Sequence, residues 1–182
     1  MTGSEFYHKF YLHKLEPGET ITRFNCADED LNDFIKNEAK AYQSALLSVT
    51  YLLTLRSNKE VIAYFSLAND KISIADFENK TEFNRFRKHK FVNEKRIRSY
   101  PAIKIGRLAV SEIAQNQSIG RYLLDYIKQR YVQEPDAGCR FITVDAYVNA
   151  IPFYIKNDFI FLNSDDEDKN TRLMYYDLAS QI

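Results

Sequence analysis

The stretch "RLAVSEIAQNQSIGRYLLDYIKQRYV", from Arg107 to Val132, decides the fold class, because an apolar run, a polar loop and an amphipathic segment follow one another in it. The apolar run that ends at Val110 predicts a buried strand, and the apolar spacing from Ile119 to about Tyr131 predicts a helix. The loop between them, "QNQSIGR", contains one glycine. Since the first backbone N–H groups of a helix attract anions, this loop is either a plain connection or an anion cradle.

Similar patterns divide the rest of the chain into short strands and helices. Apolar runs predict strands over 10–15, 49–55, 61–68, 103–110, 139–147, 159–162 and 171–178. Helical spacing predicts helices that begin near Asp28, which would be an N-cap, near Ile119 and near Asn149. The segments 49–55 and 61–68 form a predicted hairpin, whereas 69–100 is irregular. This order predicts an α+β fold with a mixed, mostly antiparallel, twisted sheet of about six to seven strands, flanked by helices on both faces.

Length and composition exclude several classes of function. The chain has 182 residues, which suits a single domain over 1–182 with an irregular basic insertion at about 76–100. It has 25 Lys and Arg against 25 Asp and Glu, so no overall field draws it to nucleic acid or to a membrane. No segment has the pattern of a signal peptide or a membrane span. Neither the cysteines nor the histidines show metal-ligand spacing; they are Cys26, Cys139, His8, His13 and His89. We therefore expect a cytoplasmic protein with reduced thiols, no metal and no membrane partner.

The strand, loop and helix around "QNQSIGR" resemble motif A of the GNAT superfamily, the N-acetyltransferases that use acetyl-CoA. The family loop has the form Gln/Arg-x-x-Gly-x-Gly/Ala; Gln115 and Gly120 agree with it, and Ser118 replaces a glycine. The resemblance implies that main-chain N–H groups hold the pyrophosphate of CoA, from Gln115, Asn116, Gln117, Ser118, Ile119, Gly120 and Arg121. It also implies that the backbone of Leu108, Ala109 and Val110 pairs with the pantetheine arm. That arrangement requires the strand at 103–110 to splay from the strand at 139–146.

A second segment, "VDAYVNAIPFYIKNDFIFL", resembles motif B of the same family. Asn149 and the pair Phe153-Tyr154 match it, and Asp158 stands where glycine is common. Asn149 is predicted as a helix N-cap, and the resemblance implies that it also contacts the cofactor. By the same resemblance Tyr154 is the general acid that protonates the departing thiolate; otherwise it packs under the sheet. Glu112 is a candidate base acting through water, or a solvated surface residue.

The amino-terminal half is similar to acetyltransferases shaped like the toxins of toxin–antitoxin pairs. Matching residues are Phe24, Cys26, Leu31, Phe34, Thr50 and Tyr51, and Ala27 replaces a glycine. The resemblance runs from Phe24 to Leu178. It implies an enzyme that acetylates aminoacyl-tRNA and is held in check by a small antitoxin.

The basic insertion gives such an RNA substrate a candidate surface. Its cations are Arg85, Arg87, Lys88, Lys90, Lys95, Arg96 and Arg98. They either contact the RNA backbone or form a solvated insertion.

Three hypotheses of function follow. The first is a GNAT-fold N-acetyltransferase in which a primary amine, on a small molecule, a peptide or aminoacyl-tRNA, attacks acetyl-CoA directly in a ternary complex. The second is the toxin-like enzyme acting on aminoacyl-tRNA. The third is an inactive CoA-binding or regulatory module, which the serine at position 118 keeps open. GNAT enzymes are often dimers, so a homodimer is also expected.

Overall fold

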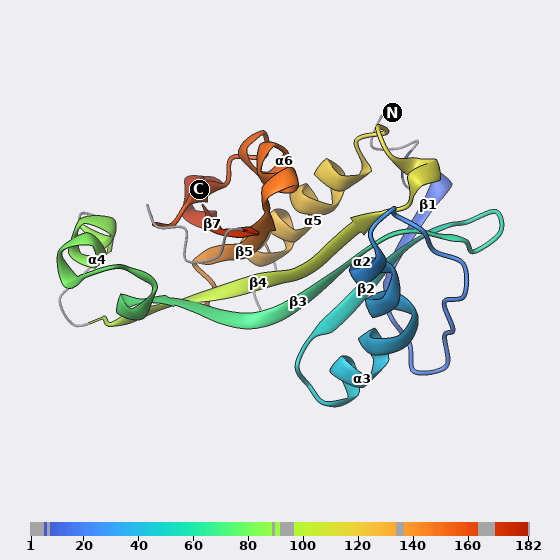
Figure 1. Cartoon of the computed structure of the whole chain (residues 1–182), viewed down its shortest axis with the longest axis horizontal. Coiled ribbons are helices and arrows are strands. Elements are labelled where there is room, and N and C mark those ends of the chain that lie inside the picture. The colour runs from blue at the N-terminus through green and yellow to red at the C-terminus, as the bar shows by residue number, and fades with distance from the viewer. Residues whose placement is uncertain are drawn as a thin grey trace. The chain divides into compact units, whose positions relative to one another are not determined.

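Backbone hydrogen bonds join seven strands into one sheet in the order β1-β2-β3-β4-β5-β7-β6 (Figure 1). This computed structural model describes residues 6, 8–88, 90–91, 97–133, 137–163 and 170–181. The strands are β1 (Phe10–Lys14), β2 (Val49–Leu55), β3 (Val61–Ser73), β4 (Ser99–Val110), β5 (Phe141–Tyr147), β6 (Ile160–Phe161) and β7 (Thr171–Asp177). The pairs β1–β2, β2–β3, β5–β7 and β6–β7 are antiparallel and β4–β5 is parallel, which confirms the predicted mixed sheet.

The helices are short except for one. They are α2 (Glu29–Asp33), α3 (Ala39–Ser44), α4 (Lys80–Arg87), α5 (Ile119–Gln133) and α6 (Ile151–Ile155), with a π-helical turn at Phe34–Glu38 between α2 and α3. Single 3₁₀ turns lie at Ile74–Asp76, Glu112–Ala114, Val148–Ala150 and Leu178–Gln181. None of the helices in the described part of the chain has the length and apolarity to cross a bilayer.

The chain falls into two units. One comprises Met1–Ala68 with Ile105–Asp125, and the other Asn69–Lys104 with Tyr126–Ile182. The long elements β3, β4 and α5 each contribute residues to both units.

In the first unit, the helical segment after Asp28 packs on the β2–β3 hairpin, with α2 and α3 beside β2 (Figure 1). The Asp28 carboxylate accepts the Leu31 N–H at 3.0 Å, so the predicted N-cap is confirmed. The apolar spacing buries one face of the segment in a core of Leu15, Ile21, Phe24, Phe34, Ile35, Ala39, Leu52, Tyr64 and Ala109. The Tyr64 hydroxyl donates to the Leu31 carbonyl at 2.7 Å and ties the helix to the sheet.

In the second unit, β5 runs parallel to β4 over Ala102–Lys104 and antiparallel to β7 over its whole length. The core here is aromatic, with Phe83, Tyr100, Phe141 and Tyr175 among its buried residues.

The prediction of an irregular segment over 69–100 is wrong for most of its described residues. β3 continues to Ser73, and α4 is capped by Asn79, whose side chain accepts the N–H groups of Thr81 and Glu82. β4 begins at Ser99 and includes Pro101, so that proline does not mark its start. The apolar face of α4 was hidden because Phe83 and Phe86 are spaced among cations, yet both pack in the aromatic core. His89, Lys95, Arg96 and the acidic turn at 164–169 lie outside the described residues.

Candidate active site

The loop that joins β4 to α5 has an unusual backbone. Asn116 and Ser118 both have φ of 61°, in the left-handed region that L-residues other than glycine seldom adopt. The first helical bond of α5 runs from the Tyr122 N–H to the Ser118 carbonyl. No acceptor among the described residues binds the backbone N–H groups from Asn116 to Arg121. A run of free N–H groups before a helix, with left-handed residues in it, is an arrangement that binds anions.

The long side chains of this loop hold the loop itself. The Gln115 side-chain amide donates to the Val110 carbonyl at 3.3 Å, and the Gln117 amide donates to the Ile113 carbonyl at 3.2 Å. Arg121 is 72% exposed and lies 3.7 Å from Asp125 one helical turn later. These contacts keep the side-chain amides of Gln115 and Gln117 on the loop backbone, while the main-chain N–H groups stay available to a ligand.

A residue that the sequence reasoning missed, Asn25, fastens the start of the loop. Its carbonyl accepts the Glu112 N–H at 2.9 Å, and its side-chain amide donates to the Glu112 carboxylate at 2.5 Å. Its side-chain oxygen accepts the N–H of Ala27 and the amide of Asn32, both at 3.0 Å. Glu112, the candidate base, is therefore exposed and bonded to Asn25. The signal was present in the sequence, because Asn25 lies between Phe24 and Cys26, two of the residues that match the toxin-like enzymes.

The strand that precedes the loop supplies Leu108, Ala109 and Val110. Ala109 is 4% exposed and belongs to the core of the first unit, whereas its two neighbours are half-buried. The β4–β5 ladder pairs Ala102 to Lys104 with Phe141 to Thr143, and no pair continues it, although β4 runs on to Val110.

In the second unit, Asn149 does not cap α6. Ala150 occupies the N-cap position, and Asn149 lies exposed within the preceding 3₁₀ turn. The predicted cap is wrong because this turn, which no sequence signal marked, displaces the start of the helix. Pro152 lies in the first helical turn, where its missing N–H removes no helical hydrogen bond.

Tyr154 lies on α6 and is 6% exposed. Its ring meets the rings of Phe153 and Phe159 edge to face, at centroid distances of 5.2 and 5.3 Å. Within the described residues its hydroxyl makes no hydrogen bond. Burial raises the pKa of the Tyr154 phenol well above its usual value, so the phenol keeps its proton at neutral pH.

Three residues stand where the GNAT resemblance predicts glycine, and all three have a left-handed backbone conformation. Ala27 has φ of 66°, Ser118 of 61° and Asp158 of 65°. No glycine in the described part of the chain has a positive φ. The substitutions have therefore changed the side chain at these positions while the backbone conformation that glycine favours has stayed.

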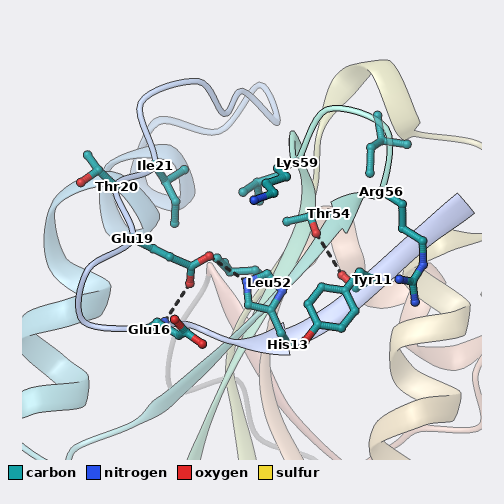
Figure 2. A pocket seen from close by; sticks show the side chains of 12 residues that line it. Tyr11, His13, Glu16, Glu19, Thr20, Ile21, Leu52, Thr54, Arg56 and Lys59 are labelled. Carbon is teal, nitrogen blue, oxygen red and sulfur yellow. Dashed lines mark hydrogen bonds and ion pairs between the residues drawn. The ribbon is translucent and has the colours of Figure 1, made fainter.

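The first unit also contains a hollow of about 410 Å³ between β1, β2 and the segment that follows β1 (Figure 2). Figure 2 shows Glu16 and Glu19 on one side of it and Arg56 on the other. His13 Nε2 lies 2.8 Å from the Glu19 carboxylate. The residues predicted to bind CoA are absent from its described lining. The described residues also contain no group of three or more His, Cys, Asp or Glu side chains suited to a metal.

Comparisons with known proteins agree with this geometry. A family model described as an acetyltransferase (GNAT) domain matches residues 20–179. A crystal structure of a KacT point mutant is 22% identical, with a TM-score of 0.74 over 94% of this chain and 96% of that one. AtaT complexed with acetyl-methionyl-tRNAfMet is 19% identical, with a TM-score of 0.70 over 94% and 96%.

A mutant AtaT toxin bound to acetyl-CoA and to the C-terminus of the antitoxin AtaR is 19% identical, with a TM-score of 0.71 over 94% of this chain and 95% of that one. At these identities the solved structures show a shared fold. The family is shown by the family model, which matches residues 20–179 and so spans most of the sequence. The chain therefore belongs to the GNAT family of acetyltransferases.

Proposed function

We propose that this chain transfers the acetyl group of acetyl-CoA to a primary amine, and that the loop from Gln115 to Arg121 binds the pyrophosphate of CoA. One observation carries the proposal, namely the run of unpartnered backbone N–H groups from Asn116 to Arg121. These donors lie at the positive end of α5, so each would stabilise a phosphate oxygen without the cost of breaking an internal hydrogen bond. Serine at position 118 fits this role because it retains both its N–H and the left-handed φ.

The backbone of Leu108, Ala109 and Val110 would bind the pantetheine arm as an added strand. The β4–β5 ladder ends before these residues, which supports this role. The arm carries amide groups that can pair with strand backbone, as peptides do when they extend a sheet. Asn149, exposed in the 3₁₀ turn before α6, is the remaining candidate contact to the cofactor.

Tyr154 would be the general acid. When the amine nitrogen attacks the acetyl carbonyl, a C–N bond forms, the C–S bond breaks and the amine loses a proton. The CoA thiolate then takes the phenolic proton of Tyr154, and the proton that the amine releases to water is returned to the phenolate. The phenol carries its proton at neutral pH, and within the described residues its hydroxyl makes no hydrogen bond that would compete with donation, which supports the role. Holding both substrates together would supply most of the rate.

Calorimetric titration with acetyl-CoA, followed by a thiol-release assay with a panel of primary amines, tests this function. Binding that requires the loop, and turnover that falls strongly in Tyr154→Phe at unchanged acetyl-CoA affinity, are the expected results. Binding without turnover on any amine would favour the inactive module. The absence of both heat and thermal stabilisation would rule out both enzyme hypotheses.

Acetylation of aminoacyl-tRNA is the second candidate function, and a groove of about 730 Å³ beside α4 supports it. Its described lining contains four cations, Lys80, Arg87, Lys88 and Arg98. The whole chain has no net charge, so this is a local concentration of positive charge of the kind that binds phosphates. The fold shared with AtaT, which was solved with acetyl-methionyl-tRNAfMet, points to the same substrate class.

Charged tRNA and labelled acetyl-CoA test this substrate. We expect label in aminoacyl-tRNA, and the double variant Lys80→Glu, Arg98→Glu should raise the KM for tRNA in a salt-dependent way. The variant should acetylate a small amine at the wild-type rate. Lys71, exposed on β3 and outside the described lining of the groove, gives the control Lys71→Glu. Equal effects of the groove and control variants would count against the groove.

An antitoxin would be the protein partner of such an enzyme, since the AtaT structure holds the C-terminus of one. Co-expression with the neighbouring open reading frame, followed by purification on a tag, tests for it. A homodimer stays a prediction, and light scattering of the purified chain would decide it.

A further inference from the structure

Lys128 is a lysine buried in the second unit. It lies on α5 and is 3% exposed. Its ammonium donates a hydrogen bond to the Asn157 carbonyl at 2.7 Å and lies 4.0 Å from the centre of the Tyr176 ring. Burying an ammonium group is unfavourable unless hydrogen bonds and aromatic faces compensate for the lost water. A lysine at this position therefore calls for an explanation beyond packing.

The carbonyl that Lys128 binds belongs to the turn that ends α6. In this turn the Asp158 N–H donates to the Ile155 carbonyl at 3.0 Å, and the Phe159 N–H donates to the Tyr154 carbonyl at 3.1 Å. These two bonds, with Asp158 in the left-handed region, form a Schellman cap. The Asn157 carbonyl is thus a rigid part of the segment that carries Tyr154.

Asn157 extends the same network toward Tyr154. Its N–H donates to the Tyr154 carbonyl at 3.0 Å, and its side-chain amide donates to the Phe153 carbonyl at 2.7 Å. Asn157 thus joins the side-chain ammonium of Lys128 to the backbone of Tyr154. Movement of the ammonium would be passed to α6 through this residue.

A second route runs through aromatic rings. The Lys128 ammonium lies 5.7 Å from the centre of the Phe159 ring. Phe159 is 1% exposed and meets Tyr154 edge to face and Tyr176 at a tilt. The Tyr154 ring is therefore set by Phe159, and Phe159 and Tyr176 in turn pack around the ammonium of Lys128.

We propose that Lys128 is a positioning residue for Tyr154, acting through Asn157 and Phe159 on the direction of the phenol. This inference rests on the proposed function for its catalytic consequence. Lys128 acts by geometry, through its hydrogen bond to the Asn157 carbonyl and its position over the Phe159 ring. General acid catalysis is sensitive to such geometry, because a misplacement of about 1 Å can lower a rate about 100-fold.

The test compares Lys128→Met, which keeps an unbranched side chain but removes the ammonium, with Lys128→Arg, which keeps the charge and hydrogen-bond donors. We expect Lys128→Met to lower kcat about 10- to 100-fold. The acetyl-CoA KM should stay near the wild-type value, and Lys128→Arg should restore part of kcat. In a Tyr154→Phe background, Lys128→Met should lower kcat by less than about two-fold, since coupled residues are not additive. Equal losses in both backgrounds, or an unchanged kcat, would overturn the proposal.

A second readout separates this proposal from the proposed function. The NMR signals of the Tyr154 ring, assigned with Tyr154→Phe, should shift in Lys128→Met whether or not the chain has acetyltransferase activity. A shifted ring without any wild-type turnover would leave the positioning intact and reject the function. An unshifted ring would reject the positioning. If Lys128→Met fails to fold, the same signals are compared in Lys128→Arg, where the longer fork should displace the ring less but measurably.

Discussion

The side-chain amide of Asn25 donates to the carboxylate of Glu112 at 2.5 Å, although the two residues lie 87 positions apart in the chain. The bond joins the loop before α2 to the turn that leads into the free N–H groups of the β4–α5 loop. It therefore links the segment that resembles the toxin-like enzymes to the proposed phosphate site within one unit.

Replacing Asn25 by alanine should loosen the phosphate loop. Of the three hydrogen bonds that the Asn25 side chain makes, the one to Glu112 holds this loop. Its loss is worth about 1 kcal/mol, which corresponds to about a five-fold weaker Kd for acetyl-CoA if the loop must be re-ordered on binding. Calorimetry measures this Kd, and Asn58→Ala, in the β2–β3 turn, is the control. Unchanged affinity in Asn25→Ala would show that the loop is ordered without it.

Ser118→Asp and Ser118→Asn form a matched pair that tests whether the loop binds an anion. Both side chains tolerate a left-handed backbone, and a carboxylate at the start of α5 also favours the helix. Repulsion of the pyrophosphate should nevertheless weaken acetyl-CoA binding by about 10-fold or more in the aspartate variant, and by less than about three-fold in the asparagine variant. The thermal midpoint should not fall in either variant. Equal affinities would speak against phosphate binding here.

Ala27→Gly should stabilise the chain, because Ala27 has φ of 66°. Relief of the left-handed strain outweighs the added freedom of the unfolded chain, for a net gain of about 0.5 to 1 kcal/mol. Ala45, which ends α3 with φ of −80°, gives the control. Ala45→Gly should destabilise by about 0.5 to 1 kcal/mol. Urea unfolding of both variants gives the two signs, and shifts in the same direction would contradict the argument.

Glu19 should make a stability contribution that disappears in acid. Burial alone would raise the pKa of its carboxyl, but the Glu16 N–H and His13 outweigh burial and hold the pKa below the usual value. A lowered folded-state pKa means that the contribution is present above the unfolded pKa and is lost as the pH falls through the folded one.

Glu19→Gln should thus be less stable than wild type near neutral pH, by at most about 1 kcal/mol for so exposed a pair. The difference should vanish between about pH 5 and about pH 3. Unfolding curves at several pH values measure it, with Glu16→Gln as the control. A difference that did not depend on pH would argue against the ion pair.

Because the phenol of Tyr154 is buried, we expect kcat to stay level on the alkaline side of its pH profile. An exposed tyrosine loses its proton near about pH 10, but the pKa of Tyr154 is raised, so kcat should not fall there. Turnover at saturating substrates across about pH 7 to about pH 10 gives the profile. A fall with an apparent pKa near 10 that is missing in Tyr154→Phe would contradict burial of the acid.

The sequence predicted those parts of the fold that depend on apolar periodicity. β2 spans Val49–Leu55 as expected, and Asp28 caps α2, because alternation and a capping carboxylate are local signals. The bounds of α6 and the existence of α4 were missed, since a 3₁₀ turn has no side-chain signature and the Phe83 and Phe86 pair is diluted by cations. Where such elements begin and end is decided by tertiary contacts, which leave no local pattern in the sequence.

The resemblance to the family predicted that the candidate site lies on the loop. It did not predict the hydrogen bonds that shape the loop or the residues that contact Tyr154. Nothing local in the sequence indicates that Gln115 and Gln117 turn back onto the loop backbone. No local pattern singles out Lys128 within the predicted helix that begins near Ile119, because its partner Asn157 lies 29 positions further on. Contacts of this range appear only when the chain is folded.

The left-handed residues at positions 27, 118 and 158 change what a family signature means for this chain. A signature spelled in amino-acid letters scores each of them as a mismatch. A signature that requires a positive φ at each position is matched by all three residues. At these positions a backbone conformation that favours glycine is present without glycine, so other chains of this fold that lack the glycines can be sought by the sign of φ where the amino-acid sequence does not reveal them.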